Sequence, residues 1–248
     1  MPCNWPSPHV DVPCGHGVSA PRHEPTATAP GAEPGDPPGG RAEVVLRLED
    51  AGLRHHGRWL FRRLSLGLRA GELLAVMGPS GVGKSTLLAC LAGATPLTEG
   101  AVRGGRSPAA ARPAIVFQDL RLVPQATLIA NVLMGRLERH TWCRTLAGFP
   151  TADRRMAFAC LQALGLDPLA HRPAGEVSGG EQQRTALARA LATGSPLVLA
   201  DEPVANLDAR LAGLALGRLR EYARTTPAAV VCVLHHERSE EHTSELQS

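Results

Sequence analysis

Lysine is nearly missing from this chain of 248 residues, which contains 25 arginines and a single lysine, Lys84. Aromatic residues make up only 3% of the sequence, and the six cysteines include no Cys-x-x-Cys pair. No apolar run approaches the length of a membrane span, and the N-terminus lacks a charged-then-hydrophobic signal pattern. We therefore expect a soluble chain whose cysteines are reduced and largely buried, as is usual in the cytoplasm.

The charge balance is mild, with a formal net charge of +3, and the arginines are scattered along the sequence. Scattered arginines are typical of a solvated surface, whereas a nucleic-acid footprint gathers them on one face. We therefore expect no nucleic-acid partner. The apolar content of 44% and the chain length leave room for one or two globular units with a sizeable core.

The single lysine lies in the stretch MGPSGVGKSTLL, Met77–Leu88. Gly78, four free positions and Gly83-Lys84-Ser85 have the phosphate-loop spacing G-x-x-x-x-G-K-S. A short apolar run that predicts a buried strand precedes the motif, and an apolar segment that predicts a helix follows it. The alternative, a glycine turn before a core helix, does not account for the complete spacing in this strand–loop–helix context.

A glycine-rich loop of this kind can bind phosphate. Its backbone N–H groups form a concave anion nest, and the following helix N-terminus adds partial positive charge. Lys84 would then bridge the outer phosphates, and the Ser85 hydroxyl would hold Mg²⁺. The candidate phosphate-binding residues are Gly78, Pro79, Ser80, Gly81, Val82, Gly83, Lys84, Ser85 and Thr86.

A second pair of functional residues follows another apolar segment, Leu197–Ala200. A buried strand there would deliver Asp201 and Glu202 to the carboxyl-terminal edge of a sheet, where ligands bind in α/β folds. Because successive residues point in different directions, Asp201 can face a magnesium ion while Glu202 faces an attacking water.

The segment Ser178-Gly179-Gly180-Glu181-Gln182 has two compatible interpretations. Ser178 and Glu181 have the spacing of a helix capping box. A serine and two glycines at a helix N-terminus are equally a surface for a γ-phosphate. Because the chain already has one phosphate loop, a second such surface suggests head-to-tail dimerisation across a nucleotide.

Strands and helices alternate along the chain, which favours a mainly parallel sheet covered by helices on both faces. Residues 1–42 are rich in proline and glycine and predict a disordered tail, or upstream sequence mistaken for coding. Thr95–Pro113 predicts a short irregular strand pair. Strands are predicted at Val44–Leu48, Leu64–Leu68, Leu73–Met77, Ala114–Phe117, Leu197–Ala200 and Ala229–Leu234, and helices at Leu128–Arg139, Asp153–Leu164, from Ser178 to about Thr193, and Asp208–Arg224.

The motifs GPSGVGKST, VFQD, VSGGEQQR, LVLADEP and NLD, followed by a histidine after the last strand, resemble the ATP-binding subunit of an ABC transporter. The resemblance runs from about Val44 to His236, and NVLMGRL, ADEPVANLD and VLHHE are most similar to phosphonate-import ATPases. It implies an α/β fold of the P-loop NTPase type: a RecA-like parallel core, peripheral antiparallel strands and a helical subdomain inserted at about 119–185, within a domain of residues 43–237.

The resemblance also implies cofactors and residue roles. ATP and Mg²⁺ would bind at the phosphate loop, and Ser85, Gln118 and Asp201 would hold the metal. Glu202 would be the general base, with Lys84, Gln118 and His235 also acting in hydrolysis. The partner's ATP would contact Ser178, Gly179, Gly180 and Gln182, and Asp208 would lie in a loop at the dimer interface.

Two departures from the family pattern stand out. His55 occupies the position where the family usually stacks an aromatic ring on adenine, and an imidazole ring stacks with less area. Trp59 is a poorer positional match and is expected in the core. Residues 238–248, RSEEHTSELQS, look like a translated sequencing adaptor in place of further strands and a helix. We therefore expect the natural chain to continue differently.

The resemblance thus predicts the ATP-hydrolysing subunit of an importer for phosphonate or a related oxyanion. It would form a homodimer or pair with another ATPase subunit on the cytoplasmic face of the inner membrane. Its partners would be transmembrane permease subunits and, indirectly, a periplasmic solute-binding protein. The alternatives are a soluble ABC protein that acts in phosphonate breakdown, without transport, and a non-functional truncated fragment.

Overall fold

A parallel sheet of four strands, in the order β3-β7-β6-β5, forms the centre of the fold. The strands are β3 (Leu73–Met77), β7 (Ala229–Leu234), β6 (Leu197–Asp201) and β5 (Ala114–Val116). Their nearly continuous apolar sequences suit strands that are covered on both faces. The computed structural model describes residues 43–104, 112–140 and 148–234, all of which lie in one compact unit. The disordered tail expected at 1–42 and the tail at 238–248 lie outside the described residues.

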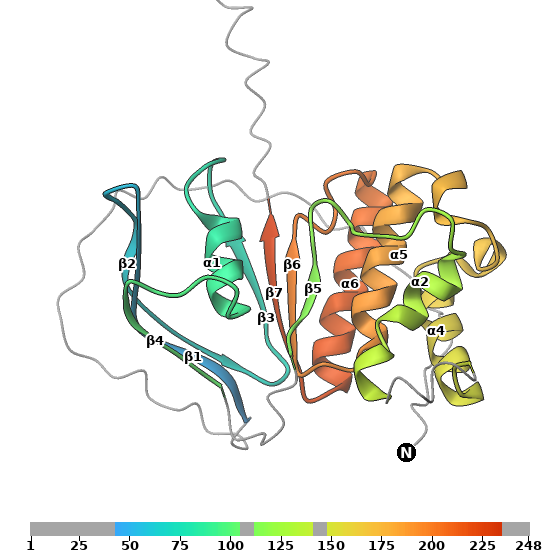
Figure 1. Cartoon of the computed structure of the whole chain (residues 1–248), viewed down its shortest axis with the longest axis horizontal. Coiled ribbons are helices and arrows are strands. Elements are labelled where there is room, and N and C mark those ends of the chain that lie inside the picture. The colour runs from blue at the N-terminus through green and yellow to red at the C-terminus, as the bar shows by residue number, and fades with distance from the viewer. Residues whose placement is uncertain (1–42, 105–111, 141–147, 235–248) are drawn as a thin grey trace, which may run out of the picture. The chain divides into compact units, whose positions relative to one another are not determined.

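Alternate residues of the central strands build two separate cores. In β6, Leu197 and Leu199 pack into one cluster, while Val198 and Ala200 pack into the other. The first cluster includes α1 (Lys84–Leu91) and the antiparallel strands; the second includes α5 (Gly179–Ala192) and α6 (Ala209–Thr225). Figure 1 shows these two sets on opposite sides of the parallel sheet. The α/β fold with peripheral antiparallel strands is therefore confirmed.

The antiparallel sheet has the order β2-β1-β4, from β1 (Val44–His55), β2 (Arg58–Arg69) and β4 (Glu99–Gly104). The sequence predicted only the first part of β1, Val44–Leu48, and the end of β2, Leu64–Leu68. In the first half of β2, exposed arginines interrupt the alternation of apolar residues. Of the strand pair predicted within Thr95–Pro113, the described residues include one strand, β4, which pairs with β1. Residues 105–111 of that stretch lie outside the described residues, so the second strand stays a prediction.

The remaining helices gather in the segment between β5 and β6. They are α2 (Leu128–Met134), η1 (Leu137–Arg139), α4 (Thr151–Ala163), η2 (Asp167–Leu169), η3 (Ala174–Glu176) and α5. The helix predicted over Leu128–Arg139 ends at Met134, where α2 crosses α5 closely. A Cβ atom on Gly135 would lie 2.5 Å from the Arg189 carbonyl oxygen. Among the described residues, no helix is both long and apolar enough to cross a bilayer.

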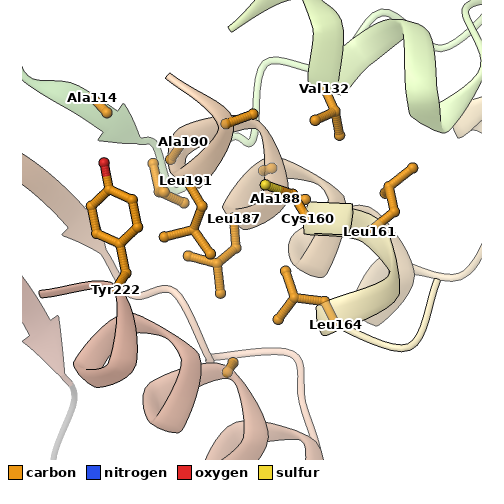
Figure 2. Packing of buried hydrophobic residues seen from close by; sticks show 14 of the residues in the cluster. Ala114, Val132, Cys160, Leu161, Leu164, Leu187, Ala188, Ala190, Leu191 and Tyr222 are labelled. Atoms are coloured by element: carbon orange, nitrogen blue, oxygen red, sulfur yellow. The ribbon is translucent and has the colours of Figure 1, made fainter. Parts of the chain in front are cut away.

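Leucines of α5 form the centre of the larger core. Leu187 and Leu191 belong to one buried cluster with Leu161 and Leu164 of the α4 region, and Figure 2 shows them between Tyr222 and that region. Tyr222 of α6 closes one end, and its hydroxyl donates to the Ser195 carbonyl at 2.9 Å. The expectation of reduced, buried cysteines holds for those that the structure describes, which are Cys90, Cys160 and Cys232. Burial raises the pKa of Cys232 to about 12.

A buried charged cluster connects α2, η1, α4 and the end of α5. Arg136 donates from Nε and Nη2 to Asp153 Oδ1 at 2.9 and 2.6 Å, and from Nη1 to the Ala192 carbonyl at 3.0 Å. His140 contacts the other oxygen of Asp153. Burial alone would raise the pKa of Asp153, but the bonds from Arg136 and His140 outweigh it and hold the pKa below its ordinary value.

We predict that Asp153→Asn destabilises the protein at neutral pH by about 3 kcal/mol, because it leaves Arg136 buried without its carboxylate. Since the pKa of Asp153 is lowered by folding, its contribution is complete above the unfolded-state value of about 3.9 and is lost as pH falls through the lower folded value. Urea unfolding at several pH values measures both effects.

The exposed pair of Glu138 with Arg112, with nitrogen and oxygen 3.8 Å apart, supplies the control. Glu138→Gln should change the free energy of unfolding by less than about 1 kcal/mol. An Asp153→Asn protein as stable as wild type at pH 7 would contradict the stabilising role of the cluster.

Candidate functional site

The parallel register brings the ends of four strands to one edge of the central sheet. Met77 pairs with Leu234, Val233 with Asp201, and Ala200 with Val116. The glycine loop, the Gln118 segment and the Asp201–Glu202 pair therefore leave the sheet at the same edge. His235 follows Leu234 directly but lies outside the described residues, so its proposed role stays a prediction.

The glycine loop connects β3 to α1, and Gly83 is its most constrained position. Gly83 has a φ of 97°, and a Cβ atom there would lie 3.2 Å from Leu60 Cβ in β2. Glycine avoids both the left-handed strain and this contact. The helix begins at Lys84, so the Lys84 and Ser85 amides belong to its first turn.

Lys84 is buried, with 8% of its surface exposed, and its ammonium is folded back onto the loop. Nζ donates to the carbonyl oxygens of Gly78 and Pro79, both at 2.8 Å. Neutral carbonyls are weaker partners for an ammonium than phosphate oxygens, since hydrogen bonds between two charged groups are shorter and stronger. The loop thus holds a buried ammonium that can exchange its hydrogen bonds to these carbonyls for stronger ones to the oxygens of an entering anion.

Asp201, at the end of β6, has a side-chain oxygen that lacks a partner. Its Oδ1 is buried and makes no hydrogen bond within the described part of the chain. A buried carboxylate oxygen without a partner is costly, and a cation removes that cost. The carboxylate, the Ser85 hydroxyl and the Gln118 amide oxygen are hard oxygen donors of the kind that Mg²⁺ prefers. The chemistry of these three side chains therefore fits Mg²⁺.

Glu202 has an unusual backbone conformation, with a φ of 51°. Its N–H donates to the Val233 carbonyl of β7 at 3.1 Å, and its carbonyl accepts from Gln183 Nε2 of α5 at 2.7 Å. The left-handed conformation turns the chain away from the strand direction at this point.

The segment after Gln118 is held by an arginine of α5. Leu120 and Arg121 have φ values of 55° and 47°, and Arg189 donates to both of their carbonyls, at 2.5 and 2.6 Å. The Arg121 guanidinium lies 3.6 Å from the centroid of the Phe117 ring. Burial and repulsion from Arg121 lower the pKa of Arg189. These contacts fix the chain immediately beyond Gln118.

The turn at Ser178 forms the expected capping box. Ser178 Oγ accepts from the Glu181 N–H at 3.3 Å, and the Ser178 N–H donates to Glu181 Oε2 at 2.8 Å. The bond from the Ser178 backbone lowers the pKa of Glu181. Gln182 Nε2 donates to the Ala174 and Val177 carbonyls, so its amide group is engaged within the chain.

The loop between β6 and α6 lies against this turn. A Cβ atom on Gly180 would lie 3.2 Å from the Asn206 carbonyl oxygen and from Leu207 Cδ2. Asp208 is the N-cap of α6, since its side chain accepts from the Leu211 N–H at 2.8 Å. The structure therefore brings the segments of Ser178 and Asp208 together.

His55 ends β1 at the hairpin next to the glycine loop. It is exposed, pairs across the hairpin with Arg58 and meets the His56 ring edge-on at 4.2 Å. The hairpin reaches the glycine loop through Leu60 and Gly83. The expectation that Trp59 lies in the core is wrong: Trp59 is 37% exposed, and the Arg62 guanidinium lies 4.5 Å from the centroid of its ring.

Two residues of the site escaped sequence reasoning, Gln183 and Arg189. Both lie in α5, and both connect it to the segments at the sheet edge. Gln183 shares a helical face with Leu187 and Ala190, which are buried. A polar residue on the apolar face of a helix is a signal that could have identified it.

The family comparison agrees with this geometry. A family model described as ABC transporter matches residues 61–205, which is more than half of the chain. The chain belongs to the ABC transporter family. It is an ABC-type ATPase, an ATP-binding subunit similar to those of phosphonate importers.

Individual relatives of the ABC family support the same placement. The chain is 38% identical to the hypophosphite import ATP-binding protein HtxD of Stutzerimonas stutzeri, over 78% of the chain and 60% of that protein. It is 39% identical to the phosphonates import ATP-binding protein PhnC of Trichormus variabilis, over 76% and 80%. Among solved structures, the dimeric ATP-binding cassette MJ0796 bound to ADP and Pi matches with a TM-score of 0.64 and 27% identity, over 77% and 88%.

We predict that Lys84→Arg weakens ATP binding roughly 10- to 100-fold, or by about 1.4–3 kcal/mol. The guanidinium is planar and longer, so it cannot reproduce the compact contacts with the loop. Isothermal titration with ATP measures the change. The reverse exchange on the exposed surface of α6, Arg220→Lys, should leave affinity unchanged. If Lys84→Arg bound ATP as wild type does, Lys84 would not be a phosphate ligand.

Proposed function

We propose that this chain is the ATP-hydrolysing subunit of an importer for phosphonate or a related phosphorus oxyanion. The observation that carries the proposal is the meeting of the Lys84 loop, Asp201–Glu202 and the Gln118 segment at one sheet edge. The phosphonate, phosphite and hypophosphite import ATP-binding proteins among its relatives support the substrate class.

In the proposed mechanism, the loop amides and Lys84 would bind the ATP phosphates, and the side chains of Ser85, Gln118 and Asp201 would hold Mg²⁺. When bound, Mg²⁺ supplies neutralisation of charge on the phosphoryl oxygens. Glu202 accepts the proton of the attacking water and orients it in line with the γ-phosphate. Phosphoryl transfer depends mainly on positioning and charge stabilisation, so each of these residues acts by holding a partner in place. His235 is proposed to contact the γ-phosphate.

The active form is proposed to be a dimer, with two ATP molecules at the interface. The Ser178 turn of one copy, with Gly179, Gly180 and Gln182, would contact the ATP held by the other copy. A helix N-terminus with exposed glycine amides suits this role. Asp208 would stand at the interface, and His55 would stack on the adenine ring. The dimeric state of the related cassette MJ0796 supports the arrangement.

Coupling to a membrane permease is proposed to run through the Gln118 segment. Beside this segment is a hollow of about 400 Å³ between the parallel core and η1, with Ala94, Ile115, Phe117 and Glu138 among its lining residues. A cytoplasmic segment of a permease subunit would occupy it, and a periplasmic protein would deliver the solute. The chain would thus act at the cytoplasmic face of the inner membrane.

Phosphonate uptake in the source cell tests the proposal. Deleting the gene should abolish uptake, and the wild-type gene should restore it. Glu202→Gln should not restore it, because the amide cannot accept the proton of water. The purified Glu202→Gln protein should still bind ATP, lose at least 100-fold in hydrolysis rate and remain a dimer with ATP in size-exclusion chromatography.

Other outcomes would select the alternatives. Normal uptake in the deletion strain, with phosphonate breakdown lost, would favour a soluble ABC protein without transport. A purified wild-type chain that neither unfolds cooperatively nor hydrolyses ATP would favour the non-functional fragment. Hydrolysis retained in Glu202→Gln would remove Glu202 from the role of general base.

A further inference from the structure

Gln183 is a buried polar residue that the proposed mechanism does not use. It lies in the first turns of α5, directly after the Ser178–Gln182 segment, and only 2% of its surface is exposed. Both ends of its amide are engaged. Nε2 donates to the Glu202 carbonyl at 2.7 Å, and Oε1 accepts from the Asn206 N–H at 3.0 Å. The side chain thus bridges α5 to the loop that follows β6.

The two bonds fix both ends of a short turn. The Ala205 N–H also donates to the Glu202 carbonyl, at 3.3 Å, so residues 202–206 form a closed turn with Gln183 across it. Gly180 packs against the same loop, within reach of the Asn206 carbonyl oxygen and Leu207. The Glu202 turn is therefore attached to the helix that begins at Ser178.

This attachment acts on a strained residue. The φ of 51° at Glu202 is strained for a residue with a Cβ atom, and such a conformation persists only where surrounding contacts hold it. On one side the Glu202 N–H is held by Val233 of β7. On the other side Gln183 donates to its carbonyl. The Ala205 N–H donates to the same carbonyl at a longer distance, 3.3 Å, from within the turn itself. Losing the Gln183 contact would therefore detach the turn from α5 and let the Glu202 backbone, and with it the carboxylate, change direction.

We propose that Gln183 is a positioning residue that holds Glu202 in its left-handed conformation. It thereby links the Ser178 turn to the orientation of the Glu202 carboxylate, the general base. The inference rests on the proposed function, in which the Ser178 turn contacts the partner's ATP and Glu202 activates water. A displacement of α5 by the partner's ATP reaches the Glu202 carbonyl through one side chain. Hydrolysis at one site would then depend on the contact between the Ser178 turn and the ATP held by the other copy.

Thr185 of the same helix provides a matched control. It is as buried as Gln183, with 0% exposed, but its hydroxyl donates only to the Glu181 carbonyl within α5, at 2.8 Å. Thr185→Val removes a buried hydrogen bond from α5 without touching the Glu202 turn. Its effect measures what a purely structural change in this helix does to hydrolysis.

The test uses steady-state hydrolysis, ATP titration and thermal unfolding of the full chain. Gln183→Met keeps the length of the side chain and removes both bonds to the loop. We expect kcat to fall at least 10-fold while the Kd for ATP stays within about threefold, since a small displacement of a catalytic group lowers rate more than binding. Thr185→Val should keep kcat within about threefold of wild type.

Gln183→Glu removes one of the two bonds and keeps the other, and it replaces Gln183→Met in the test if that variant fails to fold. Its carboxylate still accepts from the Asn206 N–H but cannot donate to the Glu202 carbonyl, so kcat should again fall. In a Glu202→Gln background, Gln183→Met should leave the ATP-bound dimer intact, because the residue positions the base and does not bind nucleotide.

Three results would overturn the inference. The first is a kcat within threefold of wild type in both Gln183 variants. The second is a fall of kcat accompanied by a fall of ATP affinity of the same factor and by a lowered unfolding temperature. The third is a similar fall of kcat in Thr185→Val. If wild-type protein itself hydrolysed no ATP, the proposed function would fail and the inference with it; normal wild-type hydrolysis with active Gln183 variants would refute the inference alone.

Discussion

The parallel pairing of β3, β7 and β6 is the constraint on which the rest of the structure depends. Its register places the glycine loop after Met77 and the carboxylates at Asp201 and Glu202 at one edge, although more than a hundred residues separate them in sequence. Because both faces of the sheet are buried, a slip in register would exchange the residues of the two cores. Packing of the cores therefore fixes the geometry of the site.

This edge of the parallel sheet carries charged side chains whose strongest partners would be the charged groups of a ligand. The Lys84 ammonium is buried against neutral carbonyls, and one Asp201 oxygen is buried without a hydrogen bond in the described residues. Such groups are held in place by folding, and a bound anion and cation would stabilise them, which is how preorganised sites act. The helix α5 also holds two segments at this edge in place. Gln183 attaches it to the Glu202 turn, and Arg189 attaches it to the segment after Gln118.

The sequence was sufficient to predict the strands of the parallel sheet, because both-face burial leaves continuous apolar runs such as Leu197–Ala200. It also predicted the capping box at Ser178, which depends on local spacing alone. It failed for the first half of β2, where exposed arginines hide the alternation, and for Trp59, whose ring is covered by Arg62 at the surface. Gln183 and Arg189 could not be assigned their bonds, because these join segments that only the fold brings together.

The Mg²⁺ dependence of ATP binding tests most directly whether this edge is the nucleotide site. The measurement is the Kd for ATP of wild type and Asp201→Asn, by titration with excess Mg²⁺ and with EDTA. We predict that Mg²⁺ tightens binding to wild type about tenfold or more, or by at least about 1.4 kcal/mol, and that Asp201→Asn loses this gain while its affinity in EDTA stays unchanged. An Asp201→Asn protein that keeps the full Mg²⁺ effect would contradict the account.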